Sequence, residues 1–404
     1  MSEWVEYSLE DVAEITSSKR IFYADYVDYG IPFYRSKEII ELYNRSEISN
    51  SLYISEQKYL EIKEKYGVPV IGDILLTSVG TLGIPYLVNN SNEFYFKDGN
   101  LTWIRKINKN IVLPDFIYCL LNSPLGKNKL DEITIGSTQA ALTIAGLKKI
   151  KISVPNLSEQ LEIVNVIQSI SKKIELLHRQ NKTLESMAEM LFRQWFVEEA
   201  QDDWEEVNVL NIFSLVGGGT PKTSIDEYWN GNIPWISGGD ISQSHKGFIS
   251  KTEKSITELG LKNSSTKLLP KLSTIISARG TVGKYALLEQ EMCFSQSNYG
   301  IIPKGHNCYY FVYLLIGFIV DELLAAAYGS VFDTITTRTF ESVDLKLPEM
   351  TVIANFEKTV IEFFKKKESN TKQIQALENL RDTLLPKLMS GEVRVSYTPE
   401  EIKQ

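Results

Sequence analysis

The chain has 404 residues, of which 43% are hydrophobic and 23% charged, so it is long enough for two or three soluble globular domains. Its net charge of −8 argues against a free-standing nucleic-acid binder, unless the basic surface is local or a partner supplies it. Three widely spaced cysteines exclude a disulfide framework and indicate a reducing, cytoplasmic compartment.

The sequence predicts neither export, nor membrane contact, nor a metal site. The start, MSEWVEYSLEDVAE, is acidic and lacks the features of a secretory signal. The longest uncharged apolar run, 308–320, is too short to span a bilayer, so we expect a buried helix. Cys293, His306 and Cys308 could be drawn as metal ligands, but a structural zinc site needs four ligands at short spacing.

Residues 1–157 form the first predicted module. Strand-like runs at 31–39, 72–88 and 96–106 combine β-branched and aromatic residues with Gly, Asn and Asp. A short amphipathic helix at 114–122 follows, and 136–155 closes the module with a small helix and a strand. This order predicts an α+β module with many loops.

The next segment, 158–199, has the strongest periodicity in the chain. Ser158, followed by acidic residues, suits a helix start. At 1.5 Å per residue, about 40 residues give a rod of roughly 60 Å. Its apolar residues recur in alternating steps of four and three, as in a coiled-coil seam, with Asn181 as the one polar member. The seam is Ile163, Ile167, Ile170, Ile174, Leu177, Asn181, Leu184, Ala188, Leu191 and Trp195.

The second half of the chain repeats the first. Residues 136–192 align with residues 329–385 without a gap, at an offset of 193 residues, and Trp204 corresponds to Trp4. Two rods in one chain most simply pack on each other. The second seam is more polar in its middle, and Pro386 should kink or end it. The predicted domains are a module at 1–157, a rod at 158–199, a module at 200–350, a rod at 351–392 and a C-terminal tail at 393–404.

The motifs, taken in this order, resemble the specificity subunit of a type I restriction-modification enzyme. They are the repeated module and rod and the segments LVGGGTPKT (215–223), IPWISGGDI (233–241), ISARGTVG (276–283), FSQSN (294–298) and LLPKLMSGEVRV (384–395). The resemblance implies a non-catalytic chain with two target recognition domains, each reading one half of a bipartite, asymmetric DNA sequence. It also implies that the rods form an antiparallel coiled coil, which gives the fold a pseudo-two-fold repeat and fixes the gap between the half-sites.

The same resemblance implies the partners. Two methylation subunits carrying S-adenosylmethionine would dock on the rods, and restriction subunits using ATP and Mg²⁺ would join them. No cofactor is then expected on this chain.

Candidate DNA contacts lie in the turns of both modules. Arg can donate to guanine, and Gln or Asn can bond adenine. The first module departs from the pattern, because TSSKR (16–20) replaces GGGTP (217–221) and SVGTLG (78–83) has no counterpart of Arg279. The candidates are Tyr34, Arg35, Ser36, Lys37, Lys97, Asn100, Thr220, Lys222, Ser237, Gly238, Gly239, Arg279, Lys284, Gln296 and Asn298.

Each of these motifs also has a structural interpretation. GGGTPKT could cradle a phosphate, or it could be a tight turn with one or two backbone contacts. Gln296 and Asn298 could cap a turn, Arg279 could form a surface ion pair, and the lysines at 365–367 could be a solvated face. Candidate partner contacts on the rods, with core packing as the alternative, are Met187, Met190, Phe192, Trp195, Phe196, Leu384, Leu385 and Leu388.

Catalytic signatures are missing from the sequence. We find no GxxxxGK[ST], HExxH or GxSxG motif. Two rival functions remain open: a structural adaptor whose modules bind proteins or glycans, which the acidic charge favours, and an autonomous DNA-modifying enzyme, which the missing motifs disfavour.

Overall fold

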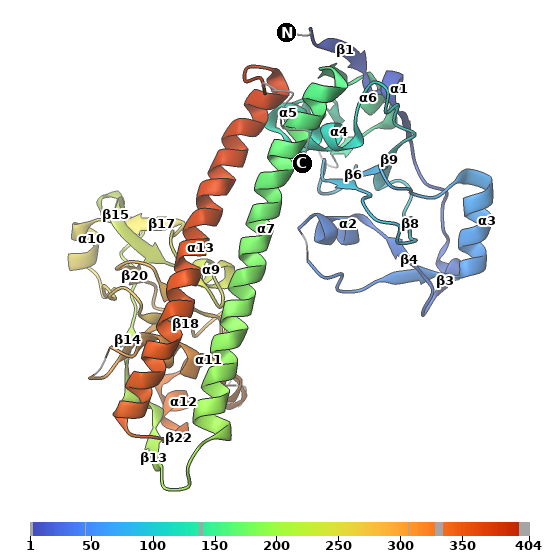
Figure 1. Ribbon diagram of the computed structural model, residues 1–404. Coiled ribbons are helices and arrows are strands. Elements are labelled where there is room, and N and C mark those ends of the chain that lie inside the picture. Colours follow the sequence, from blue (N-terminus) through green and yellow to red (C-terminus); the bar gives the residue numbers. More distant parts are fainter. Residues whose placement is uncertain (1–2, 45, 137–139, 306, 328–333, 396–404) are drawn as a thin grey trace, which may run out of the picture. The chain divides into compact units, whose positions relative to one another are not determined.

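The structure is a computed structural model that describes residues 3–44, 46–136, 140–305, 307–327 and 334–395. The chain divides into two compact units, one of residues 1–175 and 374–404 and one of residues 176–373. Each unit holds one globular module and a part of both long helices, which Figure 1 labels α7 and α13.

The first module is built on two four-stranded sheets. One has the order β2-β9-β6-β7 with antiparallel neighbours, and the other has the order β3-β5-β4-β8, in which β4 and β8 are parallel. The strands are β1 (Val5–Ser8), β2 (Glu14–Thr16), β3 (Tyr26–Val27), β4 (Ile31–Tyr34), β5 (Leu52–Ile54), β6 (Ile74–Thr77), β7 (Pro85–Leu87), β8 (Tyr95–Phe96), β9 (Leu101–Arg105), β10 (Thr134–Ile135), β11 (Ala141–Leu142) and β12 (Lys151–Val154). The helices are α1 (Leu9–Val12), α2 (Ser36–Tyr43), α3 (Glu56–Tyr66), α4 (Pro114–Asn122), α5 (Pro124–Glu132) and α6 (Ile144–Lys149).

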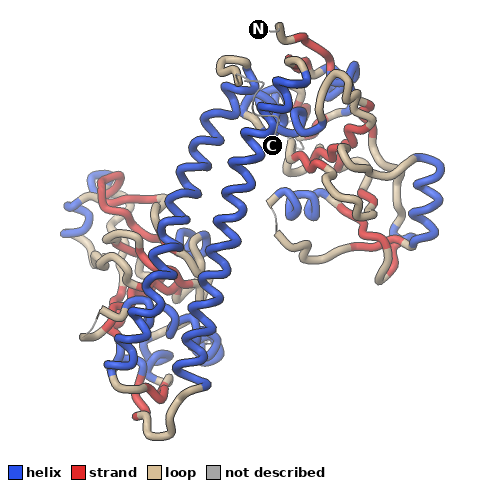
Figure 2. The backbone as a smooth tube through the Cα atoms, viewed as in Figure 1, coloured by secondary structure: helices blue, strands red, loops and turns tan. Residues whose placement is uncertain are grey.

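The second module has a five-stranded sheet, β14-β21-β18-β19-β16, and a three-stranded sheet, β17-β15-β20. Its strands are β13 (Glu205–Asn208), β14 (Phe213–Gly217), β15 (Trp229–Ile236), β16 (Phe248–Ile249), β17 (Lys254–Ile256), β18 (Thr274–Ser277), β19 (Tyr285–Leu288), β20 (Cys293–Phe294), β21 (Asn298–Pro303) and β22 (Asp344–Leu347). Its helices are α8 (Val209–Ile212), α9 (Gly238–Gln243), α10 (Glu258–Lys262), α11 (Tyr309–Ala327) and α12 (Thr337–Glu341). Figure 2 shows helices and strands mixed in both modules, so the predicted α+β class is confirmed.

The strand pairings confirm the internal repeat. The antiparallel order β2-β9-β6-β7 of the first module reappears as β14-β21-β18-β19 in the second. The parallel pair β4-β8 reappears as β15-β20, and the closing ribbon β1-β12 reappears as β13-β22. Two copies with the same pairings place equivalent loops at the same edges of their sheets.

The two long helices follow the predicted rods. α7 spans Leu157–Arg193 and continues as a π-helical turn, Gln194–Glu198, while α13 spans Met350–Ser390. The first helix starts earlier than Ser158 suggested, because the side chain of Asn156 accepts the Glu159 N–H at 2.9 Å and caps it. Pro386 does not end α13, which continues for one more turn to Ser390.

The helices are antiparallel in both units. In the first unit, Ile163 and Ile167 near the start of α7 share a core with Leu385 and Leu388 near the end of α13. In the second unit, Phe192 near the end of α7 packs on Phe356 near the start of α13, with ring centroids 5.9 Å apart. Figure 1 shows the two helices side by side.

Every predicted seam residue of α7 is buried or half-buried. The sequence allowed the lysines at 365–367 to form a solvated face of α13, and the structure differs from this expectation at one of the three. Lys365 and Lys366 are exposed, but the side chain of Lys367 is buried and so is Asn370. The polar middle of the second seam is therefore interior.

The apolar run at 308–320 is a buried helix, as predicted, although α11 continues past Asp321 to Ala327. By length and composition α11 could cross a bilayer, but most of its length is enclosed in the core of the second module. Cys119, Cys293 and Cys308 are free and buried, and burial raises their thiol pKa values, to about 12 for Cys119. His306 lies outside the described residues, and among those described no three His, Cys, Asp or Glu side chains are placed to hold a metal ion.

Candidate nucleic-acid interface

Four turns of the second module converge on one another, and we call them the second-module turns: 217–220, 237–239, 278–284 and 295–298. The Gly219 N–H donates to the Phe294 carbonyl at 2.9 Å, which ties the first turn to the fourth. The Ala278 N–H donates to the Ser297 carbonyl at 2.9 Å, which ties the third turn to the fourth. These turns contain nearly all the candidate residues that the sequence predicts in this module.

Gly218 and Gly219 serve close packing. A Cβ on Gly218 would lie 2.2 Å from the Ser295 carbonyl oxygen, and one on Gly219 would lie 2.3 Å from the Thr266 nitrogen. Because the Gly219 amide is already used, this geometry favours the tight-turn interpretation over the phosphate cradle. The hydroxyl of Thr220 contacts the side-chain oxygen of Gln296, which keeps these two candidates together.

A buried carboxylate organises the turn at 237–239. Asp240 accepts the Ser237 N–H at 2.8 Å and the Ser237 hydroxyl at 2.7 Å, and its other oxygen accepts the Glu253 N–H at 3.0 Å. One turn further on, the Ser242 hydroxyl donates to the Thr281 hydroxyl at 2.9 Å. Helix α9 is thereby fixed against the third turn, with Gly238 and Gly239 at its open end.

The third turn presents the candidate arginine. The Ser277 N–H donates to the Lys284 carbonyl at 2.8 Å, which closes the turn, and Gly280 and Gly283 adopt φ of +79° and +83°. Arg279 and Lys284 are exposed, and within the described part of the chain no carboxylate pairs with Arg279. The surface ion-pair interpretation of Arg279 therefore has no support here.

Asn298 lies inside the module, which contradicts its placement on a contact surface. Its side chain is 1% exposed and donates to the Ser295 hydroxyl at 2.9 Å. This is the turn-holding role that the sequence left open for Gln296 and Asn298. Gln296 is exposed, so it is the member of the pair that can reach a ligand.

The first module brings its candidates together in the same way. The Lys97 N–H donates to the Tyr34 carbonyl at 2.9 Å, and the Ser36 hydroxyl donates to the Asn100 carbonyl at 3.4 Å. Tyr34 stacks on Phe94, with ring centroids 4.9 Å apart. Lys37 is exposed beside this group.

Arg35 is engaged in holding this turn. Its Nε donates to the buried carboxylate of Glu38 at 3.1 Å, and its backbone N–H donates to the same carboxylate at 2.7 Å. Burial raises the pKa of Glu38, but the bonds from Arg35 outweigh that effect and the net pKa is lowered. Glu38 has the role of Asp240 in the other module, so Arg35 is first a structural partner.

The sequence interpretation missed an exposed aromatic segment of the first module, residues 20–29, which includes β3 and which we call the aromatic loop. Phe22, Tyr23 and Tyr29 are 64%, 89% and 86% exposed. Arg20 joins this loop to the candidate turns, because its Nε lies 2.9 Å from the carboxylate of Asp98, next to Lys97. The only signal in the sequence is the dense FYADYVDYG, which fits neither helical nor strand periodicity.

Among the candidate partner contacts, only Met187 and Met190 are exposed, at 39% and 60%. Trp195 and Leu384 are half-buried. The remaining four belong to the cores, so the core-packing alternative is right for Phe192, Phe196, Leu385 and Leu388. The rings of Phe192 and Phe196 face α11, whose position the helix sequence alone does not reveal.

Two modules with equivalent turns and one antiparallel helix pair define a duplicated recognition protein. A family model described as the type I restriction modification DNA specificity domain matches residues 1–186 and again residues 201–379. The chain belongs to this family, the non-catalytic specificity subunits of type I restriction-modification systems.

Individual relatives agree with this assignment. The chain is 24% identical to the type I restriction enzyme HindI specificity subunit of Haemophilus influenzae, over 97% of this chain and 100% of that protein. It is 27% identical to the MjaIX specificity subunit of Methanocaldococcus jannaschii, over 80% of this chain and 78% of that protein. The solved S subunit from M. genitalium shares the fold, with a TM-score of 0.61 and 15% identity, over 98% of this chain and 97% of that chain.

Proposed function

We propose that this chain reads a bipartite, asymmetric DNA target, with one half-site read by each module. The supporting observation is that equivalent turns carry different side chains. Glu38 and Asp240 hold the same turn in the two modules, yet that turn offers Ser36 and Lys37 in one and Gly238 and Gly239 in the other. Unlike loops on matching frames suit readers of two unlike sequences.

In the second module, the proposed DNA surface consists of polar groups on the second-module turns and of Lys222, which follows the first of them. Arg279 can donate to guanine and Gln296 can bond adenine, while Lys222 and Lys284 meet phosphates. Thr220, Ser237 and the two glycines after it complete this surface by allowing close backbone approach. A local basic group of this kind reconciles DNA binding with a net charge of −8.

In the first module, the proposed surface extends from the candidate turns onto the aromatic loop. Lys37, Lys97 and Asn100 contact backbone and base edges. Tyr23 and Tyr29 stack on bases or wedge between them, because exposed aromatic rings gain most by covering another π-face. Asp25 and Asp98 in this region are paired with Lys58 and Arg20, so their charge is largely neutralised.

The helix pair is proposed to set the gap between the half-sites and to dock two methylation subunits. Among the candidates taken from the sequence, Met187 and Met190 are the exposed apolar residues available for such a contact. An open hollow of about 740 Å³, lined in part by Trp195, Trp204 and Met350, lies in the same unit and would accept a side chain of a partner. S-adenosylmethionine, ATP and Mg²⁺ would be bound by the methylation and restriction subunits, and the complex would act in the cytoplasm, where the DNA is.

The test is a methylome of a host that carries this chain with its methylation subunits. Wild type is expected to give one bipartite motif with a fixed gap. Exchange of residues 1–157 for the first module of another family member is expected to change one half of that motif and leave the other half and the gap unchanged. A change in both halves, or no bipartite motif at all, would contradict the proposal.

The alternative, an adaptor whose modules bind proteins or glycans, is not favoured, because the family model of the DNA specificity domain matches both halves of the chain. Mobility shifts of duplexes by the assembled methylation complex separate the two, since an adaptor gives no sequence-selective shift.

A further inference from the structure

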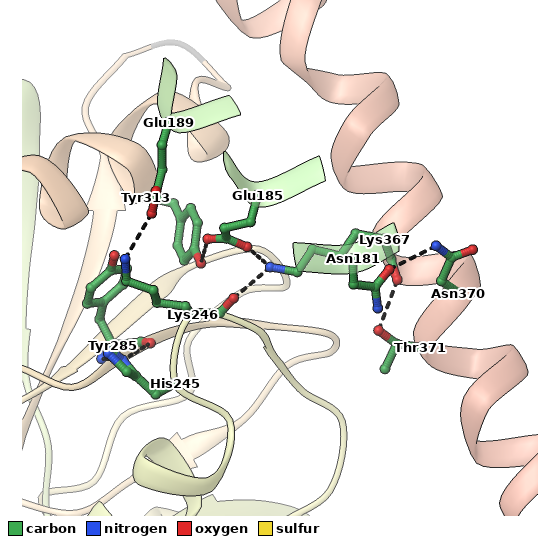
Figure 3. Close-up of polar contacts among 10 residues, drawn as sticks. All are labelled: Asn181, Glu185, Glu189, His245, Lys246, Tyr285, Tyr313, Lys367, Asn370 and Thr371. Atoms are coloured by element: carbon green, nitrogen blue, oxygen red, sulfur yellow. Dashed lines mark hydrogen bonds and ion pairs between the residues drawn. The ribbon is translucent and has the colours of Figure 1, made fainter. Parts of the chain in front are cut away.

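One buried lysine joins three parts of the second unit. Lys367 extends from α13 with 7% of its surface exposed, contacts the carboxylate of Glu185 on α7, and donates to the Lys246 carbonyl at 2.6 Å. Figure 3 shows its side chain reaching between Glu185 and the loop that carries Lys246. The lysine therefore bonds both the other helix and the recognition domain.

Both partners of Lys367 are themselves held. Glu185 accepts the hydroxyl of Tyr313, from α11, at 2.6 Å. Lys246 donates its N–H to the Tyr285 carbonyl at 2.9 Å and pairs its ammonium with Glu189 at 2.9 Å. The loop of Lys246 directly follows α9, whose other end carries Ser237 and Gly238, so its position is transmitted to a candidate reading turn.

Apolar contacts alone would leave the angle of this domain less defined. Tyr310 stacks on Phe364 of α13 with ring centroids 4.3 Å apart, and this contact stabilises the domain mainly through the apolar surface that it buries. Polar contacts follow directly along α13, where Glu368 meets Lys271 at 3.2 Å and Lys372 meets Glu289 at 3.5 Å. The lysines of those two pairs are about half-exposed, so the pairs are weak. Two buried side chains of α13 bond the domain directionally: Glu357 accepts N–H groups of α11, and Lys367 bonds the loop that follows α9.

The repeat supports a special role for this position. At the offset of 193 residues, Lys367 corresponds to Ile174, an ordinary apolar seam residue that is 6% exposed. An isoleucine would fill the seam at no desolvation cost, whereas burial lowers the pKa of Lys367 to about 7. In either protonation state the nitrogen retains an N–H for the Lys246 carbonyl.

We propose that Lys367 is a positioning residue that fixes the angle of the second recognition domain on the helix pair and, through it, the gap length that the complex accepts. This rests on the proposed reading of a bipartite target. Neighbouring gap lengths differ by one base pair, about 3.4 Å and a tenth of a turn, so a small angular freedom is enough to admit them.

The experiment uses the full chain with its methylation subunits and compares methylomes. Lys367→Met removes the contact to Lys246. The double variant Lys367→Met with Glu185→Gln also removes the unpaired carboxylate while keeping an acceptor for Tyr313, so it carries the test if the single variant fails to accumulate. Lys366→Met, exposed on the same helix, is the matched control.

Both Lys367 variants are expected to methylate sites whose gap is one base pair shorter or longer than the wild-type gap. The methylated fraction of these sites should be at least about fivefold higher than in wild type, and the half-site sequences should be unchanged. Hydrogen exchange of the Gly247 and Leu287 amides should also be faster in these variants than in the control. If the double variant keeps the wild-type gap length and the wild-type rates of hydrogen exchange, Lys367 does not position the domain and the inference is overturned. A wild-type methylome without a bipartite motif would instead remove the proposed function on which the inference rests.

Discussion

The side-chain amide of Asn370 on α13 donates to the side-chain oxygen of Asn181 on α7 at 2.9 Å. The same amide donates to Gln180 at 2.9 Å, and Asn370 is fully buried. A buried polar pair in a helix seam lowers stability in exchange for a defined alignment. The sequence identified Asn181 as such a residue, and the structure supplies its partner.

Replacement of both asparagines by leucine should therefore raise the free energy of unfolding by about 1–3 kcal/mol, since two polar groups leave the interior together. Asn370→Leu alone should gain less, because it leaves the Asn181 oxygen without its donor. Urea unfolding of the three proteins measures this order. A double variant less stable than wild type would show that the pair contributes stability and is not merely a device of alignment.

Gly218→Ala should destabilise the second module by about 2 kcal/mol or more, because the new Cβ would lie 2.2 Å from the Ser295 carbonyl oxygen and force the turns apart. Gly217→Ala is the matched control, since a Cβ there meets nothing within 4 Å, and it should change stability by less than about 0.5 kcal/mol. Thermal unfolding reports both. Equal effects would mean that the close approach at Gly218 does not determine the stability of the turn.

Arg279→Ala should weaken binding of the assembled methylation complex to its target duplex by about 1–3 kcal/mol and relax the motif at one position of one half-site. Lys262→Ala, an exposed change on α10, should leave the motif unchanged. Fluorescence anisotropy at fixed salt and the methylome measure the two effects. A uniform loss at all sequences, with a smaller salt dependence, would reassign Arg279 to a phosphate contact.

The repeat, the rods and most of the strands could be predicted because their signal is local. α7 keeps one seam over many turns, and Ile163 or Leu177 is recognisable from its neighbours in sequence alone. Helices α2 and α3 were missed within runs interpreted as strands and turns. α3 does have a Ser55 cap, the buried pair Tyr59 and Ile62, and a terminal Gly67, but its few apolar residues give a weak period.

Whether a residue is buried or exposed could not be predicted where an element distant in the sequence covers it. Phe192 and Phe196 resemble partner contacts until α11, more than a hundred residues later, covers them. Lys367 resembles a solvated lysine until Glu185 and the Lys246 carbonyl surround it. The convergence of the second-module turns is likewise set by strand pairings that no single motif encodes.

Tyr23→Ser with Tyr29→Ser should leave the stability of the first module within about 0.5 kcal/mol of wild type, because both rings are almost fully exposed. The same change should weaken binding to the target duplex by about 1–3 kcal/mol for each stacked base. Leu60→Ser, which alters another exposed apolar residue of this module, is the control. Unchanged DNA binding together with unchanged stability would remove the aromatic loop from the proposed surface.

Glu357 on α13 should make the stability of the second unit depend on pH. It accepts the Tyr310 and Phe311 N–H groups at 3.1 and 2.8 Å, yet burial outweighs these bonds and raises its pKa from 4.5 to about 7. Below pH 4.5 the group is protonated in the folded and the unfolded chain. Between pH 4.5 and about 7 only the folded chain keeps the proton, so stability should fall as pH rises, and above about 7 the loss is complete.

The side chain introduced by Glu357→Gln does not titrate, so the variant should lose most of this pH dependence. In wild type the free energy of unfolding should fall by about 1–3 kcal/mol between pH 4.5 and about 7. Glu357→Gln should also lower stability at every pH, because its amide group cannot accept the second backbone N–H. Glu362→Gln, whose side chain is 70% exposed on the same helix, should keep the wild-type profile. Urea unfolding at half-unit pH steps distinguishes them, and a fall of the same size in Glu357→Gln would place the titrating group elsewhere in the unit.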